Sequence, residues 1–126
     1  MEGGSEEHTG ETRKIRVEIV APPLGSTVEA AEVVAQVEDV SRADAPSVVV
    51  AEERLQDVKV EPGAVISFEI DVPAELVDSK SSYSVRVHVD VAGTGEVEVG
   101  DLVSTTSNPV LTRGHGDEAR VEVQLV

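Results

Sequence analysis

Histidine is the side chain most often used for proton transfer and metal binding near neutral pH. This sequence holds three of them, at His8, His88 and His115, and no two have the spacing of ligands on one strand. Cysteine is absent, so no thiolate is available to complete a zinc set. The segment 115–118 offers oxygen ligands to calcium, but it lacks the dense alternation of carboxylates that calcium loops show. We therefore expect no metal site and interpret this segment as an acidic turn.

Nucleophilic catalysis is not indicated either. Serine is plentiful, but the chain has no Gly-x-Ser-x-Gly turn and no glycine-rich phosphate loop that ends in lysine. The segment Gly93-Thr94-Gly95 is more typical of a hairpin turn than of an anion site. We expect a protein that is not an enzyme and that binds no cofactor.

Alternating apolar side chains predict β-strands along the whole chain. The clearest is the segment 83–91, where Tyr83, Val85, Val87 and Val89 share one face. Residues 28–32 could form a helical turn instead of a strand, and residues 74–80 could form another. About seven strands with turn signals between them predict an all-β fold, an antiparallel two-sheet β-sandwich of generally immunoglobulin-like architecture. The expected strands cover residues 15–19, 33–38, 47–55, 66–72, 83–91, 97–107 and 121–125.

Valine dominates the apolar residues, with 26 Val against 6 Leu and 4 Ile. Its branched side chain fits a pleated surface, which supports the all-β prediction. Aromatic residues make up only 2%, so the core must be built from valine, with Phe68 and Tyr83 expected inside it. The Tyr83 hydroxyl could reach a backbone group at a corner of the fold. The scarcity of aromatic rings counts against recognition of nucleic acids and carbohydrates.

The charge is strongly negative, with 25 acidic and 10 basic residues and a formal net charge of −15. Such a field repels nucleic acids and anionic lipids and favours basic partners, although scattered acids are also an ordinary means of solubility. We expect residues 1–12 to be a disordered tail and residues 13–126 to form a single domain. No apolar run is long enough to span a membrane. No signal peptide is visible, which predicts either a cytoplasmic protein or a chain that begins after a removed leader.

Four segments resemble, in order, those of a known family. Residues 37–52 read Val-Glu-Asp-Val-Ser-Arg-Ala-Asp-Ala-Pro-Ser-Val-Val-Val-Ala-Glu, and residues 108–114 read Asn-Pro-Val-Leu-Thr-Arg-Gly. Between them lie Phe68-Glu69-Ile70 and Tyr83-Ser84-Val85-Arg86. From about residue 15 to the end, the chain resembles the YbaY/YscW family of bacterial envelope lipoproteins.

The resemblance implies a β-sandwich without enzymatic activity or cofactor. The better-understood family members are lipoproteins that act as chaperones, or pilotins, for the outer-membrane ring of type III secretion. It therefore implies a place in the cell envelope and a protein partner in the outer membrane or in a secretion system. This chain departs from the family in two respects. It has no cysteine to carry a lipid anchor, which keeps a cytoplasmic location open, and Asn108 replaces an aromatic residue.

The residues of the two main motifs have two possible roles, as structural turn residues or as partner contacts. Asp39, Ser41 and Asp44 can bond nearby backbone amides, and Arg42 can pair with Asp44 or reach a carbonyl. The candidate residues are Asp39, Ser41, Arg42, Asp44, Pro46, Asn108, Pro109, Leu111, Arg113 and Gly114.

Three hypotheses for function remain open. A protein that binds or chaperones a protein partner should show an apolar groove or an open sheet edge, where a peptide can add. An accessory envelope protein without a specific partner should show a uniformly acidic surface. A module that binds a cation or small ligand through its carboxylates should be stabilised by calcium. The oligomeric state is not predicted.

Overall fold

The protein is described by a computed structural model that covers residues 11–42 and 44–126. The predicted tail lies outside the described residues except for Glu11 and Thr12, and Thr12 is the first residue of a strand. The division into a tail and a single domain stays a prediction. The elements are β1 (Thr12–Val20), β2 (Val28–Asp39), β3 (Val48–Val60), β4 (Val65–Pro73), the 3-10 turn η1 (Ala74–Leu76), β5 (Tyr83–Asp90), β6 (Leu102–Ser104), β7 (Pro109–Val110) and β8 (Glu118–Leu125).

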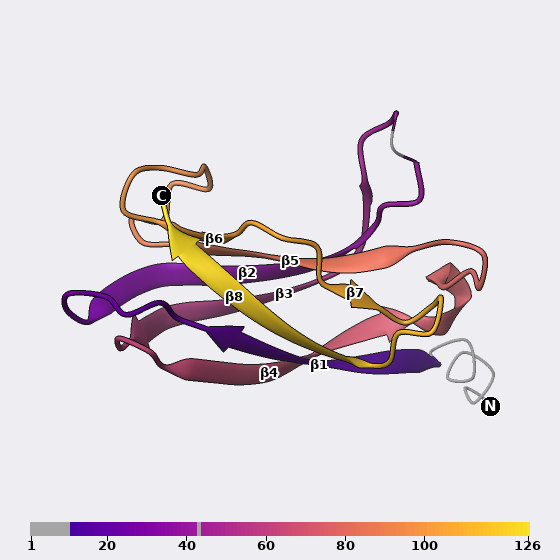
Figure 1. Cartoon of the computed structure of the whole chain (residues 1–126), viewed down its shortest axis with the longest axis horizontal. Coiled ribbons are helices and arrows are strands. Elements are labelled where there is room, and N and C mark those ends of the chain that lie inside the picture. The colour runs from indigo at the N-terminus through magenta and orange to yellow at the C-terminus, as the bar shows by residue number, and fades with distance from the viewer. Residues whose placement is uncertain (1–10, 43) are drawn as a thin grey trace, which may run out of the picture.

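The prediction of an all-β fold is confirmed, but the arrangement of the strands differs from the expected one. The strands follow one path in the order β3-β2-β5-β6-β8-β1-β4, with β7 paired to β5. Strand β8 makes this path continuous, because residues 118–122 pair with β1 and residues 123–125 pair with β6. The β1–β8 pair is parallel. The predicted antiparallel two-sheet sandwich is therefore corrected to a nearly closed, barrel-like sheet of mixed strand directions (Figure 1).

The correction has a physical reason: the alternation of apolar and polar residues along a strand carries only part of the information that defines a sheet. A period of two shows which face of a strand is buried, but it does not show which strands lie beside it. The partners of β8 are decided by its course across the molecule, which Figure 1 shows as the long yellow strand that passes in front of the others. No residue type in β8 distinguishes the parallel half of its pairing from the antiparallel half.

The core is built from the inward faces of these strands, largely as the alternation predicts. Its fully buried side chains are mainly valine and isoleucine, and Tyr83 is 2% exposed. Each buried valine contributes about 1.5 kcal/mol or more, so many small side chains compensate for the missing aromatic rings. Phe68, which was also expected in the core, only packs against its edge and stays partly exposed. The main buried strand residues are Ile15, Val17, Ile19, Val33, Ala35, Val37, Ile70, Val72, Val85, Val87, Val89, Leu102, Val121 and Val123.

The two segments in which a helical turn was considered, residues 28–32 and 74–80, fold differently. Residues 28–32 belong to β2, so no helical turn forms there. Residues 74–76 form the short 3-10 turn η1, within the segment where a helical turn was predicted. The Tyr83 hydroxyl accepts the amide N–H of Asp78 at 2.8 Å and donates to the carbonyl of Leu76 at 2.9 Å. This corner contact, which the sequence predicted, ties the connection between β4 and β5 to the start of β5.

The strand predicted over residues 97–107 is wrong over most of its length, because only Leu102–Ser104 are paired. Residues 91–101 form a loop that is held by two buried carboxylates. Asp90 accepts the amides of Gly93, Thr94 and Gly95, and Asp101 accepts those of Val91 and Glu98. Amides bonded in this way are not available for a strand ladder.

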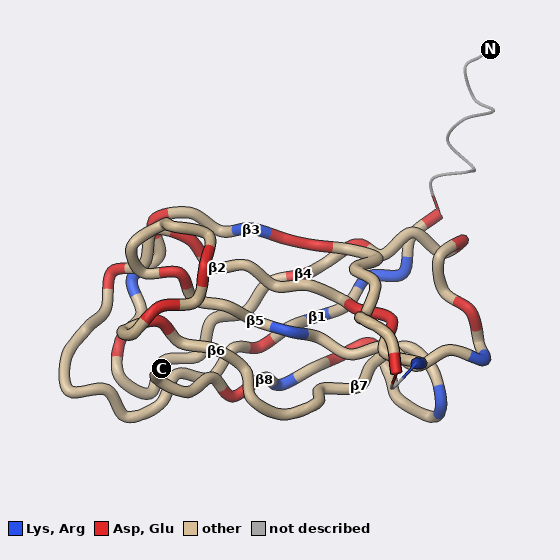
Figure 2. Tube along the Cα trace, turned by 90° about the horizontal axis from the view of Figure 1, so that it is seen from above, with Lys and Arg blue, Asp and Glu red and all other residues tan. Residues whose placement is uncertain are grey.

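Acidic residues occur along the whole of the backbone trace, with basic ones between them, and do not gather in one part of the molecule (Figure 2). This distribution agrees with the scatter of acids along the sequence. Across the described ranges, the structure contains no helix of the length and apolar character that crossing a membrane would require.

Candidate partner-binding surface

The first motif lies at the end of β2 and in the loop that follows, which projects from the body of the molecule (Figure 1). The Asp39 carboxylate accepts the backbone N–H and the hydroxyl of Ser41. These two bonds hold the pKa of Asp39 below its ordinary value. The Ser41 hydroxyl oxygen in turn accepts the backbone N–H of Ser82. Asp39 and Ser41 therefore shape the turn and attach it to the connection between β4 and β5.

Other residues of this motif are placed differently. Arg42, Asp44 and Pro46 are exposed. Of the two contacts considered for Arg42, the ion pair with Asp44 is not formed among the residues that the structure describes. Arg42 and Pro46 line a hollow of about 430 Å³, and these two side chains and the exposed Asp44 remain candidates for contact with a partner. The hollow is lined by Asp39, Ser41, Arg42, Ala45, Pro46, Val48 and Ser81.

The second motif covers β7 and the loop that follows it. Asn108 donates to the carbonyls of Val85 and Thr106, and Pro109 pairs with Ser84. The Asn108 side chain therefore holds the entry to β7 through its hydrogen bonds.

Left-handed backbone marks the rest of the second motif. Leu111 has φ 76° and Arg113 has φ 61°, and both carry a side chain that disfavours this conformation, whereas Gly114 at φ 85° does not. The loop is held by neighbouring contacts. Leu111 is buried, and the Arg113 guanidinium donates to the carbonyl of Lys80 at 2.7 Å. A conformation that is held against its local preference in this way indicates a constrained loop.

The tertiary structure brings the two motifs to the same end of the molecule, with the connection between β4 and β5 between them. Ser82 bonds the first motif, and the hydroxyl of Thr112 in the second donates to the carbonyl of Ser81. Most of their polar side chains are used to hold this arrangement. Whether their exposed members also contact a partner stays a prediction.

Sequence analysis missed one cluster, His88, Asp90 and Asp101, whose ligand atoms lie within 4.8 Å of one another. His88 and Asp90 are two residues apart on β5, which is a visible signal, but Asp101 joins them only through the folding of the loop. The Asp101 carboxylate lies 2.8 Å from His88 Nε2. Both carboxylates are almost fully buried and already accept five backbone amides. This arrangement fits a clamp for the loop 91–101 better than a cation site.

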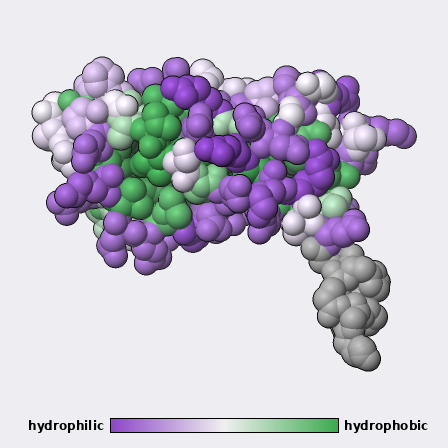
Figure 3. Space-filling view, turned by 90° about the horizontal axis from the view of Figure 1, so that it is seen from below, coloured by the Kyte–Doolittle hydropathy of each residue, from purple (hydrophilic) through white to green (hydrophobic). Residues whose placement is uncertain are grey.

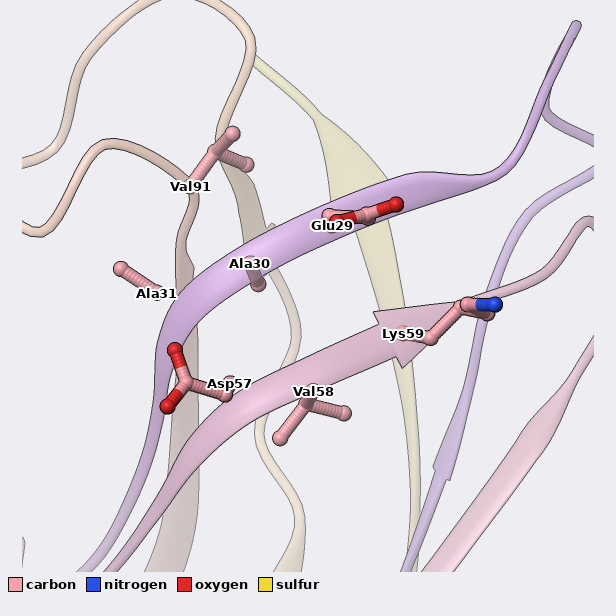
Figure 4. Close-up of a pocket in the computed structure, with 7 residues that line it drawn as sticks. All are labelled: Glu29, Ala30, Ala31, Asp57, Val58, Lys59 and Val91. Carbon is pink, nitrogen blue, oxygen red and sulfur yellow. The ribbon is translucent and has the colours of Figure 1, made fainter.

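A hollow of about 340 Å³ lies where β2 and β3 bend together, beside the left-handed Asp57. Figure 4 shows that the charged side chains of Asp57 and Lys59 point away from each other. No set of polar groups converges on one point in this hollow, so it does not have the form of a catalytic site. Its lining residues are Glu29, Ala30, Ala31, Asp57, Val58, Lys59 and Val91.

The two free edges of the sheet, β3 and β4, meet along an open seam. They are the ends of the strand path, and no ladder pairs them in the described residues, although a tight turn joins them and they contact each other. We call the core-side residues of these two edges that stay exposed or partly exposed the β3–β4 seam: Glu53, Leu55 and Val58 from β3, and Ile66 and Phe68 from β4. Its four apolar residues pack against the core but remain partly exposed.

The surface view agrees with this description. Seen from the side of β4, apolar side chains gather in one area, toward the end where β3 turns into β4 (Figure 3). Much of the surrounding surface is hydrophilic. A partly exposed apolar area between two unpaired strand edges is the type of surface that accepts a segment of another chain.

These features define a small all-β protein with a nearly closed sheet, braced loops at one end and an open apolar seam. The family model for the type III secretion system lipoprotein chaperones (YscW) matches residues 12–123 of the sequence, so the chain belongs to this family. The predicted resemblance is confirmed. A family of chaperones supports a role in binding a partner rather than in catalysis.

A solved structure has the same fold. It is described as an alternative pilotin from the type II secretion system of Vibrio cholerae. The two superpose with a TM-score of 0.69 at 18% sequence identity, over 92% of this chain and 100% of the other. No curated protein matches the sequence.

Proposed function

We propose that this chain binds and chaperones a protein component of a bacterial secretion system, at the outer membrane, and that the β3–β4 seam holds the partner. The open seam is the observation that carries the proposal. It combines the two structural features expected of a partner-binding protein, an apolar surface and unpaired strand edges. The family supports the nature of the partner, because its description is that of a secretion lipoprotein chaperone.

The alternative of an accessory protein with no partner requires a uniformly acidic surface without an apolar area. The apolar area in Figure 3 argues against it. The alternative of a carboxylate-based cation site finds little support, because the buried carboxylates are bonded to amides.

The proposal is tested by blocking the seam. The chain has no cysteine, so a single introduced thiol can be labelled selectively. A bulky maleimide on Glu53→Cys would fill the seam without removing an apolar core contact. The same label on Glu122→Cys, an exposed residue of β8, is the matched control. The labelled proteins are used to capture outer-membrane secretion components from detergent extracts of the source cells, with identification by mass spectrometry.

We expect the unlabelled protein and the protein labelled at position 122 to capture the same secretion component, and the protein labelled at position 53 to lose it. Capture that is equal for both labelled proteins would show that the seam is not the contact surface. Thermal unfolding of each labelled protein checks that the fold is retained.

The envelope location is the second part of the proposal. It is supported by the family, whose members are described as lipoprotein chaperones. Cell fractionation and an intact mass, measured on the product of the native full-length gene, test it directly. A membrane-associated product with the added mass of lipid is expected, and an unmodified cytosolic product would contradict it.

A further inference from the structure

Glu53 occupies an unusual position on β3. Its strand partner is Ala35, a fully buried residue of β2, and partners across a ladder project to the same face of the sheet. The neighbours Glu52 and Arg54 project to the other face, where Glu52 bonds Gln36 and Arg54 bonds Glu32. Glu53 therefore projects on the core-facing side, between the partly buried Ala51 and Leu55.

This inward-facing carboxylate is exposed only because β3 is an edge strand. Within residues 11–42 and 44–126 it has no hydrogen bond or ion pair through its side chain, whereas Glu32 and Glu52 both bond Arg54. A negative charge thus stands on the core-facing side of β3, two residues from Leu55 at one end of the seam, with no bonded partner among the described residues. A segment that covers the seam would have to cover this charge as well, and an uncompensated buried charge is strongly unfavourable.

We propose that the seam selects a cationic amphipathic segment, with Glu53 as the residue that determines specificity. The apolar side chains of the segment would cover Leu55, Val58, Ile66 and Phe68, and a lysine or arginine would face Glu53. This inference rests on the proposed function and names the chemistry of the partner. The net charge of −15 favours the approach of the same segment over long distances. The charge of Glu53 then sets the register in which the segment lies on the seam.

An inward charge on an edge strand has another known use, because it discourages pairing between copies of the same protein. The two roles make different predictions. If the charge is only protective, its removal changes self-association alone. Any charged side chain at position 53 would then protect the edge equally well. A specificity charge affects the affinity for one type of segment, and reversal of its sign should reverse the preference.

The probes are two synthetic amphipathic peptides of equal length with the same leucine face, one with lysine and one with glutamate on the polar face. Their affinities are measured by fluorescence anisotropy at physiological ionic strength. Glu53→Gln and Glu53→Lys are compared with Glu122→Gln and Glu122→Lys, which change the net charge equally on β8. Size-exclusion chromatography monitors self-association.

We expect the lysine peptide to bind the unmodified protein and the position 122 variants similarly. Glu53→Gln should bind it at least about 30-fold more weakly, the lower end of the loss seen when one partner of a covered charge pair is removed. Glu53→Lys should prefer the glutamate peptide. Equal losses at positions 53 and 122 would overturn the proposal, since they would indicate only general attraction. Self-association of Glu53→Gln with unchanged affinity would overturn it in favour of edge protection.

The failure of this inference can be separated from the failure of the proposed function. If the bulky label at position 53 blocks capture of the partner while Glu53→Gln binds the lysine peptide normally, the seam remains the contact surface and the role of the charge is wrong. If the label itself has no effect, the proposed contact surface is wrong.

Discussion

At the scale of single residues, Asp90 and Asp101 do most to shape the surface around β5. Both are buried carboxylates that accept backbone amides, and Asp101 also bonds His88. Burial alone would raise the pKa of Asp101. The hydrogen bonds from His88 and from the amides of Val91 and Glu98 outweigh this effect, so the pKa of Asp101 lies below its ordinary value.

This shift predicts a dependence of stability on pH. The folded-state pKa is below the unfolded value, about 4. The charged carboxylate therefore stabilises the fold at higher pH, and this contribution is lost as the pH falls through the folded pKa. We expect Asp101→Asn to lower the free energy of unfolding at neutral pH by about 1–3 kcal/mol. The variant should also lose less stability than the unmodified protein on acidification.

Urea denaturation at a series of pH values measures both effects. Asp44→Asn is the control, because Asp44 is exposed and has no hydrogen bond through its side chain among the described residues. A pH profile of Asp101→Asn that parallels that of the unmodified protein would show that the carboxylate contributes no such dependence.

At the scale of elements, the connection between β4 and β5 organises the end of the molecule that carries both motifs. It bonds the loop after β2 through Ser82, the loop after β7 through Ser81 and Lys80, and β5 through Tyr83. The motif loops are therefore not independent. A change in this connection is transmitted to both of them.

Tyr83→Phe tests this dependence. The ring stays in the core, but the hydroxyl that bonds Asp78 and Leu76 is removed. We expect the free energy of unfolding to fall by about 1–3 kcal/mol. We also expect faster amide hydrogen exchange in residues 76–82. Ser79→Ala, at an exposed position of the same connection, should change neither quantity, and an unchanged exchange rate in Tyr83→Phe would show that the hydroxyl does not brace the connection.

At the scale of the whole molecule, the dominant property is the net charge of −15 spread over a small barrel-like fold. Like charges at this density repel one another and destabilise the compact state. The seven ion pairs that lysine and arginine form among the described residues compensate little of this repulsion, since most of them are largely exposed.

The melting temperature should therefore rise by several degrees when sodium chloride is added to a buffer of low ionic strength, because salt screens the repulsion. Differential scanning calorimetry measures this. A variant with Glu75, Glu96 and Glu122 changed to glutamine should show a smaller rise, as it carries less negative charge. A melting temperature that does not change, or that falls with salt, would contradict the expectation.

The sequence by itself determined much of this protein. Alternating valines identified the strands and their buried faces, as in the segment 83–91, because burial on one face leaves a period of two in the chain. The motifs identified the family, and the position of Tyr83 predicted its corner hydrogen bonds. These features could be predicted because they are local, or because they are carried by a recognisable run of residues.

Only the tertiary structure decided the features that depend on which strands become neighbours. The division of β8 between two partners, one of them parallel, nearly closes the sheet and leaves β3 and β4 as its free edges. This pairing creates the seam and exposes Glu53 on an inward face, while the β5–β6 ladder and the folding of the loop 91–101 bring Asp101 to His88. Alternation records only whether a side chain is buried, and no local signal specifies the strand that lies beside it.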